Sequence, residues 1–321
     1  MKILLVNPAT TDTRKGNHVT SDRWTRHLED LGHTVSVHHQ YKPGDWDALV
    51  ALHAYKSAAD IEQFANEHPD QLLIVALTGT DVYRDLEQEP RTKESLDYAD
   101  RLITLQPLAR NNVPEQYQHK IHVVHQSVSV DGISPQRPEL VDEGFFALSV
   151  AHLRDVKDPL RLGYATQDLP DESAIHAYHL GATLEDRYEE ELQKLEASGR
   201  FHYLGERPRD DTLEFIKGAD VLVISSRLEG GANVVTEAIS LGTPVLASDI
   251  PGNRGLLGDD YPGYFPVEST DELRDLLLRC ESNRDFLHRL QTEIDNLQSL
   301  ALPKTERAEW KDVLQSFQTF R

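Results

Sequence analysis

Ala219-Asp-Val-Leu-Val-Ile-Ser-Ser226, followed closely by Glu229-Gly-Gly-Ala-Asn-Val-Val-Thr-Glu237, is the stretch that decides the fold. The first segment is short, apolar and rich in β-branched residues, which predicts a buried parallel strand. The second contains a glycine pair, which predicts a turn into a helix that ends at Gly242. Glycine lets the backbone approach a ligand closely, and the N–H groups at the start of a helix attract a diphosphate. We therefore expect an anion site between this strand and this helix.

Two carboxylates, Glu229 and Glu237, lie eight positions apart and bracket the expected anion site. Glu229 in the loop could reach a sugar, and Glu237, deeper in the fold, could accept both hydroxyl groups of a ribose. A glycine-rich turn from a strand into a helix is also common as a plain tight connection in α/β proteins. The second carboxylate, the Pro-Val strand that follows and the matching N-terminal half favour a nucleotide-sugar pocket.

The composition excludes several classes of protein. A chain of 321 residues exceeds what one hydrophobic core usually supports, so two domains are expected. The 33 basic and 54 acidic residues give a net charge of −21, which argues against nucleic acid or an anionic membrane surface as a partner. No apolar run approaches the ~20 residues of a membrane span, and the first residues read as a strand rather than a signal peptide.

The single cysteine, Cys280, excludes an internal disulfide bond and fits a reducing compartment. Its neighbours, Leu276-Leu-Leu-Arg, indicate the face of a helix, so a thiol in the core is favoured over a nucleophile. Together with the absence of a span or leader pattern, this predicts a cytoplasmic protein.

Strand and helix patterns alternate through both halves of the chain. Buried strands are predicted at 2–6, 34–37, 47–52, 72–77, 101–105 and 120–124, and then at 145–150, 175–180, 201–204, 221–225 and 245–247. This alternation predicts an α/β protein with parallel sheets and right-handed crossovers. Because region 130–143 has prolines, charges and no period, we place a linker there, between an N-terminal Rossmann-like domain at 1–140 and a C-terminal one at 141–302.

Ligands of open α/β sheets lie at the carboxyl ends of the strands. That rule selects five loops, at 7–17, 53–57, 78–84, 151–158 and 226–233. Each loop holds polar or charged residues that a mere connection does not need, so we expect ligand contacts from all five.

Several of these loop residues have more than one interpretation. The segment Arg14-Lys-Gly-Asn17 offers cations at a glycine turn, or is a solvated basic loop. His53 directly follows a strand and could contact a transferred sugar or a leaving diphosphate, although a lone histidine is usually structural. Asp81 could bind a sugar hydroxyl, orient a cationic neighbour or cap the helix that follows it. Arg84 could bind an anion, and Arg207 could stack on a nucleobase, pair with a phosphate or lie on the surface.

The segment from Ala219 to Pro251 resembles, without gaps, the E-x7-E signature of retaining GT-B glycosyltransferases. The resemblance implies two Rossmann-like domains that face each other across a cleft. It also implies that no metal or other cofactor takes part, and that a C-terminal helix at 303–321 crosses back to the first domain. The histidines agree with the expected absence of a metal, because no pair of them lies with a carboxylate at ligand spacing.

The same family holds the donor diphosphate with an arginine and a lysine five positions apart, in the loop that corresponds to 151–157. Lys157 matches this pattern, but His152 stands in the place of the arginine and Arg154 lies two positions later. Either Arg154 replaces the missing guanidinium or a smaller set of cations suffices.

The strand-end rule and the resemblance together predict three sets of site residues. The catalytic set is Lys15, His53, Arg154 and Lys157. The donor-binding set is Gly16, Arg207, Ser226, Glu229, Gly230, Gly231, Ala232, Asn233, Val234 and Glu237. The acceptor-binding set is Asn17, Arg23, Thr80, Asp81 and Arg84.

Residues 1 to about 266 also resemble a narrower family, the selenosugar synthases of selenoneine biosynthesis. The resemblance is carried by Arg14-Lys-Gly-Asn17, Arg23-Trp24, Ala51-Leu-His-Ala54, Lys56-Ser-Ala58 and Ala76-Leu-Thr-Gly-Thr-Asp-Val-Tyr-Arg-Asp85. It implies transfer of a sugar, typically N-acetylglucosamine, from a UDP-sugar to selenophosphate, with loss of UDP and phosphate.

The residues by themselves indicate only an anionic acceptor. Selenophosphate is a small, highly charged anion whose selenium is a nucleophile without deprotonation, so cations are needed more than a general base. Lys15, Arg23 and Arg84 would suit such an acceptor. The alternatives are a glycosyltransferase with a different small acceptor, a GT-B-type sugar-nucleotide epimerase, and a catalytically silent sugar-nucleotide binding protein.

Overall fold

The computed structural model describes residues 1–9, 16–141 and 144–318, and it divides the chain into two compact units. Unit 1 comprises Met1–Ser127 and Leu302–Arg321, and unit 2 comprises Val128–Ala301. The change of unit after Ser127 corrects the boundary predicted after residue 140. The reason is that the predicted linker binds unit 2: Arg137 donates to the carbonyl oxygen of Gly218 at 2.8 Å and to Asp220 at 2.9 Å.

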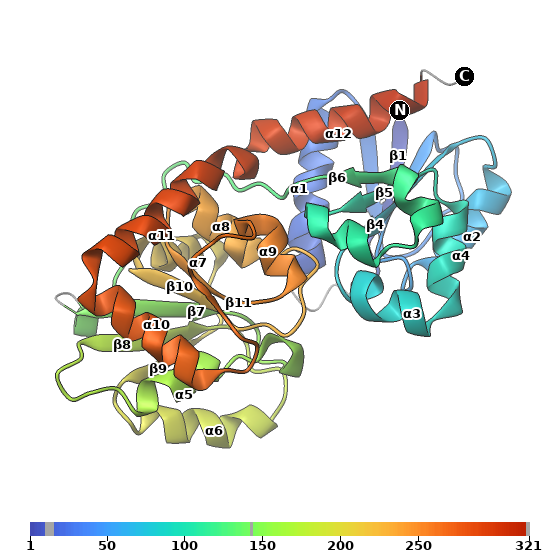
Figure 1. The fold of residues 1–321 in the computed structure, drawn as a ribbon. Coiled ribbons are helices and arrows are strands. Elements are labelled where there is room, and N and C mark those ends of the chain that lie inside the picture. The colour runs from blue at the N-terminus through green and yellow to red at the C-terminus, as the bar shows by residue number, and fades with distance from the viewer. Residues whose placement is uncertain (10–15, 142–143, 319–321) are drawn as a thin grey trace. The chain divides into compact units, whose positions relative to one another are not determined.

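Unit 1 is built on one sheet of six parallel strands (Figure 1). In spatial order these are β2 (Thr34–His38), β1 (Lys2–Val6), β3 (Ala48–Leu52), β4 (Leu72–Leu77), β5 (Arg101–Thr104) and β6 (Ile121–Val123). All six strands lie where the sequence predicted them. The central strands β3 and β4 are buried along their whole length, because apolar side chains pack on both faces of the sheet.

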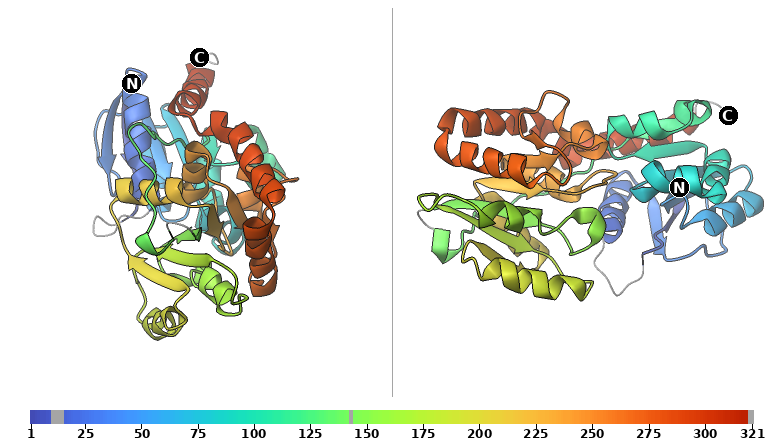
Figure 2. Two further views of the ribbon diagram at one scale, coloured as in Figure 1. Left: turned by 90° about the vertical axis from the view of Figure 1, so that its left-hand side faces the viewer. Right: turned by 60° about the horizontal axis from the view of Figure 1, so that its bottom comes forward.

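The helices of unit 1 come from both ends of the chain. They are α1 (Gly16–Asp30), α2 (Ala58–Glu67), α3 (Leu86–Gln88), α4 (Pro90–Tyr98) and α12 (Pro303–Gln318), with a π-helical turn at Asp81–Asp85. α12 packs across α1, and Figure 2 gives two further views of the ribbon. Trp24 of α1 and Trp310 of α12 are fully buried, and their rings meet edge to face with centroids 4.9 Å apart. The C-terminal helix therefore completes the core of unit 1.

A buried ion pair reinforces the contact between α1 and α12. Glu306 has no exposed surface, and both its carboxylate oxygens accept from Nε of Arg23 at 2.9 Å. It also accepts from Nε1 of Trp24 at 2.8 Å. Burial opposes the ionisation of Glu306, but the charge of Arg23 and hydrogen bonds from His27, Ser127 and Arg23 hold its pKa below the ordinary value. Arg23 thus neutralises a carboxylate inside unit 1, which corrects its prediction as an acceptor-binding residue.

Unit 2 has a second sheet of six parallel strands. Their spatial order is β12 (Tyr264–Phe265), β11 (Val245–Ser248), β10 (Val221–Ile224), β7 (Phe145–Val150), β8 (Ile175–Leu180) and β9 (Phe201–Gly205). β10, which the sequence predicted as a buried parallel strand, lies inside the sheet between β7 and β11 and is buried throughout. The carboxyl end of β10 is therefore surrounded by the loops of its neighbours.

In the part of unit 2 that the structure describes, five α-helices connect these strands and two more follow β12, and together they cover the faces of the sheet (Figure 1). They are α5 (Arg161–Gln167), α6 (Arg187–Glu196), α7 (Arg209–Gly218), α8 (Asn233–Leu241), α9 (Pro251–Leu257), α10 (Thr270–Ser282) and α11 (Arg284–Leu297). α8 ends at Gly242 with φ of 73°, a left-handed conformation that favours glycine, as predicted. Cys280 is buried in the core, and burial raises the pKa of its thiol to about 12. Among the described ranges, no helix is both long and apolar enough to cross a bilayer.

Candidate functional site

The turn between β10 and α8 has the predicted geometry. β10 ends at Ile224 and α8 begins at Asn233. Ala232 occupies the N-cap position, and its methyl side chain cannot accept the first N–H groups of the helix. This end of α8 therefore suits an anion, which would also be favoured by the helix dipole. The predicted donor residues of the turn and first helical residues are Gly230, Gly231, Ala232, Asn233 and Val234.

Glu229 is held inside the turn instead of extending into solvent. Its side chain is 9% exposed, and Oε1 accepts hydrogen bonds from Nζ of Lys157 at 2.5 Å and from Oγ of Ser226 at 2.6 Å. The backbone is packed tightly as well, because a Cβ atom on Gly252 would lie 2.1 Å from the carbonyl oxygen of Glu229. The structure thus brings together three predicted residues from two loops.

Glu237 is also buried, and its partner was missed by the sequence analysis. Oε1 of Glu237 accepts from NH1 of Arg209 at 2.8 Å. Arg209 is the first residue of α7, whereas Arg207, the residue predicted for the nucleobase, lies exposed two positions earlier. A cation in the first turn of a helix is unfavourable for the helix dipole. That misplaced charge was the available signal that Arg209 has a carboxylate partner.

The loop 151–158 is fixed to the end of β8. The N–H of Leu153 donates to the carbonyl oxygen of Ala182 at 2.9 Å, and Nδ1 of His152 accepts the N–H of Ala182 at 3.1 Å. His152 is therefore engaged in shaping the loop. Arg154, in contrast, has a buried Nε without a hydrogen-bond partner among the residues that the structure describes. This difference favours Arg154 over His152 as a donor to an anion.

In unit 1, the loops after β3 and β4 form a hydrogen-bonded cluster around His53, which has φ of 72°. Thr80 donates to Asp85 at 2.9 Å, so its Oγ1, 3.1 Å from Nε2 of His53, accepts the Nε2–H. Nδ1 of His53 accepts the N–H of Lys56 at 3.4 Å. Burial lowers the pKa of His53, although the charges of Asp81 and Asp85 oppose the shift. Both ring nitrogens of the neutral imidazole are engaged within unit 1, and a contact with substrate stays a prediction.

The structure gives Asp81 a backbone-binding task that the sequence did not suggest. It is fully buried and accepts the backbone N–H groups of Ala54 at 3.1 Å, Thr78 at 3.2 Å and Gly79 at 2.7 Å. None of these groups belongs to the helix after Asp81, so it is not a cap, and it has no surface for a sugar hydroxyl. Asp81 instead ties the loop after β3 to the loop after β4, which corrects its prediction as an acceptor-binding residue.

The remaining residues predicted in the first half differ in how the structure places them. Arg84 is well exposed, with 59% of its side-chain surface accessible, and pairs with Asp85 at 2.8 Å. Gly16 and Asn17 lie in the first turn of α1. Lys15 falls outside the described residues.

Residues 130–296 match the family model described as glycosyl transferases group 1. The chain belongs to the group 1 glycosyl transferases. The matched segment lies in unit 2 and includes Lys157, Glu229 and Glu237, so the family assignment rests on the part of the chain that carries the β10–α8 turn.

Individual proteins resemble this glycosyl transferase along nearly its whole length. Glycosyltransferase 1 domain-containing protein 1 of Xenopus tropicalis is 24% identical in an alignment of 344 positions, which covers 94% of this chain and 98% of that protein. Sucrose-phosphate synthase from Thermosynechococcus elongatus is similar over 100% of both chains, with 14% identity and a TM-score of 0.81. HepE of Anabaena in complex with UDP-glucose covers 98% of this chain and 100% of its own, with 15% identity and a TM-score of 0.77. These likenesses confirm the GT-B fold class.

His179 gives this glycosyl transferase a predictable response to acid. The ring is fully buried beneath loop 151–158, with Nε2 donating to the carbonyl oxygen of Ala151 at 2.9 Å and Nδ1 2.7 Å from Oγ of Ser149. Burial lowers its pKa from 6.5 to about 4. Because the folded-state pKa lies below the unfolded value, protonation favours unfolding, and stability contributed by the neutral ring is lost as the pH falls from 6.5 toward 4.

We expect this loss to reach about 3 kcal/mol at pH 4, at 1.36 kcal/mol per pKa unit. Urea unfolding between pH 7 and 4.5 measures the trend, and NMR titration of the His179 ring isolates its share. A ring that titrates near 6.5 in the folded protein would show that this cause is wrong.

Proposed function

We propose that this glycosyl transferase moves a sugar, N-acetylglucosamine, from a UDP-sugar to selenophosphate, with release of UDP and phosphate. The observation that carries the donor half is the Lys157–Glu229 pair beside the start of α8, with Glu237 buried in the helix. The complex of HepE with UDP-glucose supports a UDP-sugar as the donor, since the two proteins share a fold over almost their whole length. The selenosugar synthase resemblance of the N-terminal loops supports the acceptor.

Each donor residue has a distinct task in this proposal. Glu237 accepts the ribose hydroxyl groups, and Glu229 faces the sugar. Lys157 and Arg154, with backbone N–H groups near Val234, stabilise the negative charge that grows on the diphosphate as the glycosidic bond breaks. Fixed cations supply this stabilisation, so the proposal includes no metal ion.

The acceptor step needs a nucleophile but no general base. Selenium of selenophosphate attacks the anomeric carbon, a carbon–selenium bond forms, and the carbon–oxygen bond to UDP breaks with UDP as the leaving group. Water then cleaves the selenium–phosphorus bond, which releases phosphate and leaves the selenium on the sugar. Since the selenium attacks without losing a proton, a neutral His53 with both ring nitrogens engaged is compatible with the step.

The acceptor proposal draws on fewer residues than the sequence suggested. Arg23 and Asp81 are engaged inside unit 1, so exposed Arg84, together with Thr80, Asn17 and Lys15, remains in the proposed acceptor set. In a chain with a net charge of −21, a small multiply charged anion is repelled at long range, so local cations are needed.

Glu237→Gln should weaken UDP binding by about 1–3 kcal/mol, the cost of losing a charged hydrogen bond. Calorimetric titration with UDP measures the change. Arg209→Ala is the matched control, because it removes the same ion pair from the other side and leaves the carboxylate for the ribose. We expect Arg209→Ala to weaken UDP binding far less than Glu237→Gln does, because the Glu237 carboxylate stays in place to accept the ribose hydroxyl groups. Equal losses in both variants would mean that Glu237 only anchors Arg209.

Mass spectrometry of reaction products tests the whole proposal. The full chain is incubated with a mixture of UDP-sugars, with and without selenophosphate. We expect a selenium-containing sugar and UDP only when selenophosphate is present, with the N-acetylhexosamine donor preferred. Transfer to another small acceptor would overturn the selenosugar assignment and keep the transferase. A changed sugar nucleotide without any acceptor would indicate an epimerase, and intact UDP-sugars throughout would indicate a binding protein.

A further inference from the structure

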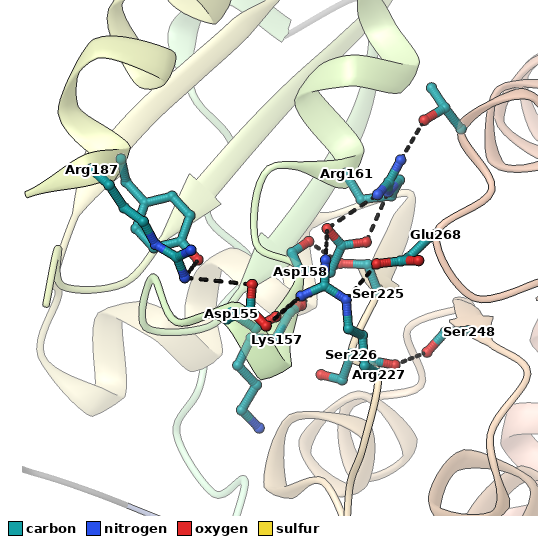
Figure 3. Close-up of polar contacts among 12 residues, drawn as sticks. Asp155, Lys157, Asp158, Arg161, Arg187, Ser225, Ser226, Arg227, Ser248 and Glu268 are labelled. Atoms are coloured by element: carbon teal, nitrogen blue, oxygen red, sulfur yellow. Dashed lines mark hydrogen bonds and ion pairs between the residues drawn. The ribbon is translucent and has the colours of Figure 1, made fainter. Parts of the chain in front are cut away.

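Arg227 joins the loop of Lys157 to the loop of Glu229. It lies between β10 and α8, two positions before Glu229, and its backbone N–H donates to the carbonyl oxygen of Val156 at 2.9 Å. NH1 of Arg227 donates to the carbonyl oxygen of Asp155 and lies 3.0 Å from its carboxylate. One residue therefore binds the β7–α5 loop through both its backbone and its side chain, immediately before Lys157 (Figure 3).

The residue after Lys157 is tied to the same turn. Asp158 is buried and has φ of 45°, a conformation that non-glycine residues adopt only when the surroundings impose it. Its carboxylate accepts from Nε of Arg161 at 2.8 Å and lies 3.7 Å from NH2 of Arg227, and its carbonyl oxygen accepts from Oγ of Ser225 at 2.8 Å. The residues on both sides of Lys157 are therefore bound to the β10–α8 turn, and they hold Lys157 in place.

Arg227 also controls the local charge. Its guanidinium lies between Asp155, Asp158 and Glu268, with Glu268 accepting from Nε at 2.7 Å (Figure 3). About a third of the Arg227 side chain is exposed, so water screens only part of these interactions. Without this cation, Arg161 alone would face the carboxylate of Asp158, and Asp155 and Glu268 would add negative charge beside a site for a diphosphate.

We propose that Arg227 is a positioning residue for the transfer reaction: it clamps loop 154–158 onto the β10–α8 turn and so holds the Lys157 ammonium where the leaving diphosphate develops charge. The role of the diphosphate in this inference rests on the proposed function, whereas the clamp itself rests on the contacts alone. Nothing in the sequence pattern marked Arg227, because its partners lie 41 to 72 positions away along the chain.

Arg227→Ala tests the clamp against a matched control, Arg187→Ala. Arg187 of α6 also pairs with Asp155, at 3.5 Å, but contacts neither Asp158 nor the β10–α8 turn in the interactions that the structure shows (Figure 3). Steady-state kinetics with a UDP-sugar should show turnover lowered about tenfold or more by Arg227→Ala and less than about twofold by Arg187→Ala. Arg227→Lys, which keeps the charge but cannot bridge three carboxylates, should recover little turnover.

A double-mutant cycle separates positioning from a general loss of structure. If Arg227 acts through Lys157, then Arg227→Ala should lower turnover by less than about twofold in a Lys157→Ala background. Losses that multiply in the double variant would overturn the proposal, as would equal effects of Arg227→Ala and Arg187→Ala.

Hydrogen exchange of the unliganded proteins gives a readout that does not depend on activity. The amides of 155–158 should exchange about tenfold faster in Arg227→Ala and at the wild-type rate in Arg187→Ala. Unchanged exchange in Arg227→Ala would overturn the clamp whatever the kinetics. A wild-type chain that neither binds UDP nor transfers sugar would instead overturn the proposed function and the diphosphate role with it, while faster exchange would still establish the clamp.

Discussion

Lys157→Ala should lower turnover with a UDP-sugar by about a hundredfold or more while weakening donor binding far less. The reason is that the negative charge on the departing diphosphate is larger in the transition state than in the bound donor, and Lys157 is a cation that the fold holds in place beside the β10–α8 turn. Its loop is tied to β8 through Leu153 and to the β10–α8 turn through Arg227 and Ser225. A cation that is already in place stabilises the developing charge without any rearrangement of the site, and such groups contribute most to catalysis in this way.

The variant also removes the partner of a nearly buried carboxylate, so its effect needs a control. Lys157→Ala leaves Glu229 without its 2.5 Å ion pair, whereas the double variant Lys157→Ala/Glu229→Gln leaves no stranded charge. We expect the double variant to regain stability but not turnover. Rapid-quench measurement of a single turnover, beside UDP calorimetry, separates the steps. Normal turnover with weakened donor binding would contradict the assigned role of Lys157.

Glu306→Ala should lower the free energy of unfolding by about 3–5 kcal/mol, the usual cost of removing one partner of a buried ion pair. Buried Arg23 would then lose its hydrogen bonds to the carboxylate, and Nε1 of Trp24 would lose its acceptor. Since the pKa of Glu306 is held below its ordinary value of 4.5, the carboxylate stabilises the fold above that pH, and this contribution is lost as the pH falls below it.

Chemical denaturation at pH 7 measures this loss, and Asp30→Ala provides the control. Asp30 pairs with Arg307 across the same two helices, but both side chains are about half exposed, so we expect a loss of less than about 1 kcal/mol. If the two variants lose similar free energies of unfolding, the buried ion pair stabilises the fold no more than the surface pair does.

The sequence predicted the architecture well because the signals for it are local. Runs such as Leu72–Leu77 and Val221–Ile224 are apolar and β-branched, and each forms a buried parallel strand. α8 ends at Gly242 because the backbone there has a left-handed conformation, which glycine adopts readily. The residue type alone therefore indicates the end of the helix. Features of this kind depend on a few neighbouring residues, so their pattern is sufficient.

The site was predicted less completely, because its charges are paired across long separations. Lys157 and Glu229 are 72 positions apart, and Arg23 and Glu306 are 283 apart. The sequence shows each of these charges but not its partner. Arg23 was therefore interpreted as a cation for an acceptor, whereas in the structure it neutralises a buried carboxylate. The role of Asp81 was missed for a related reason. The three backbone N–H groups that it accepts come from two separate loops, which only the fold brings together.

Hydrogen exchange of the full chain with and without saturating UDP tests the central claim most directly, namely that loop 154–158 and the β10–α8 turn form one nucleotide-sugar site in unit 2. The account predicts that UDP slows exchange in both 154–158 and 229–237, and that inorganic phosphate at the same concentration protects neither segment to a similar extent. Binding of UDP that leaves both segments unprotected, or no detectable binding of UDP, would contradict the account.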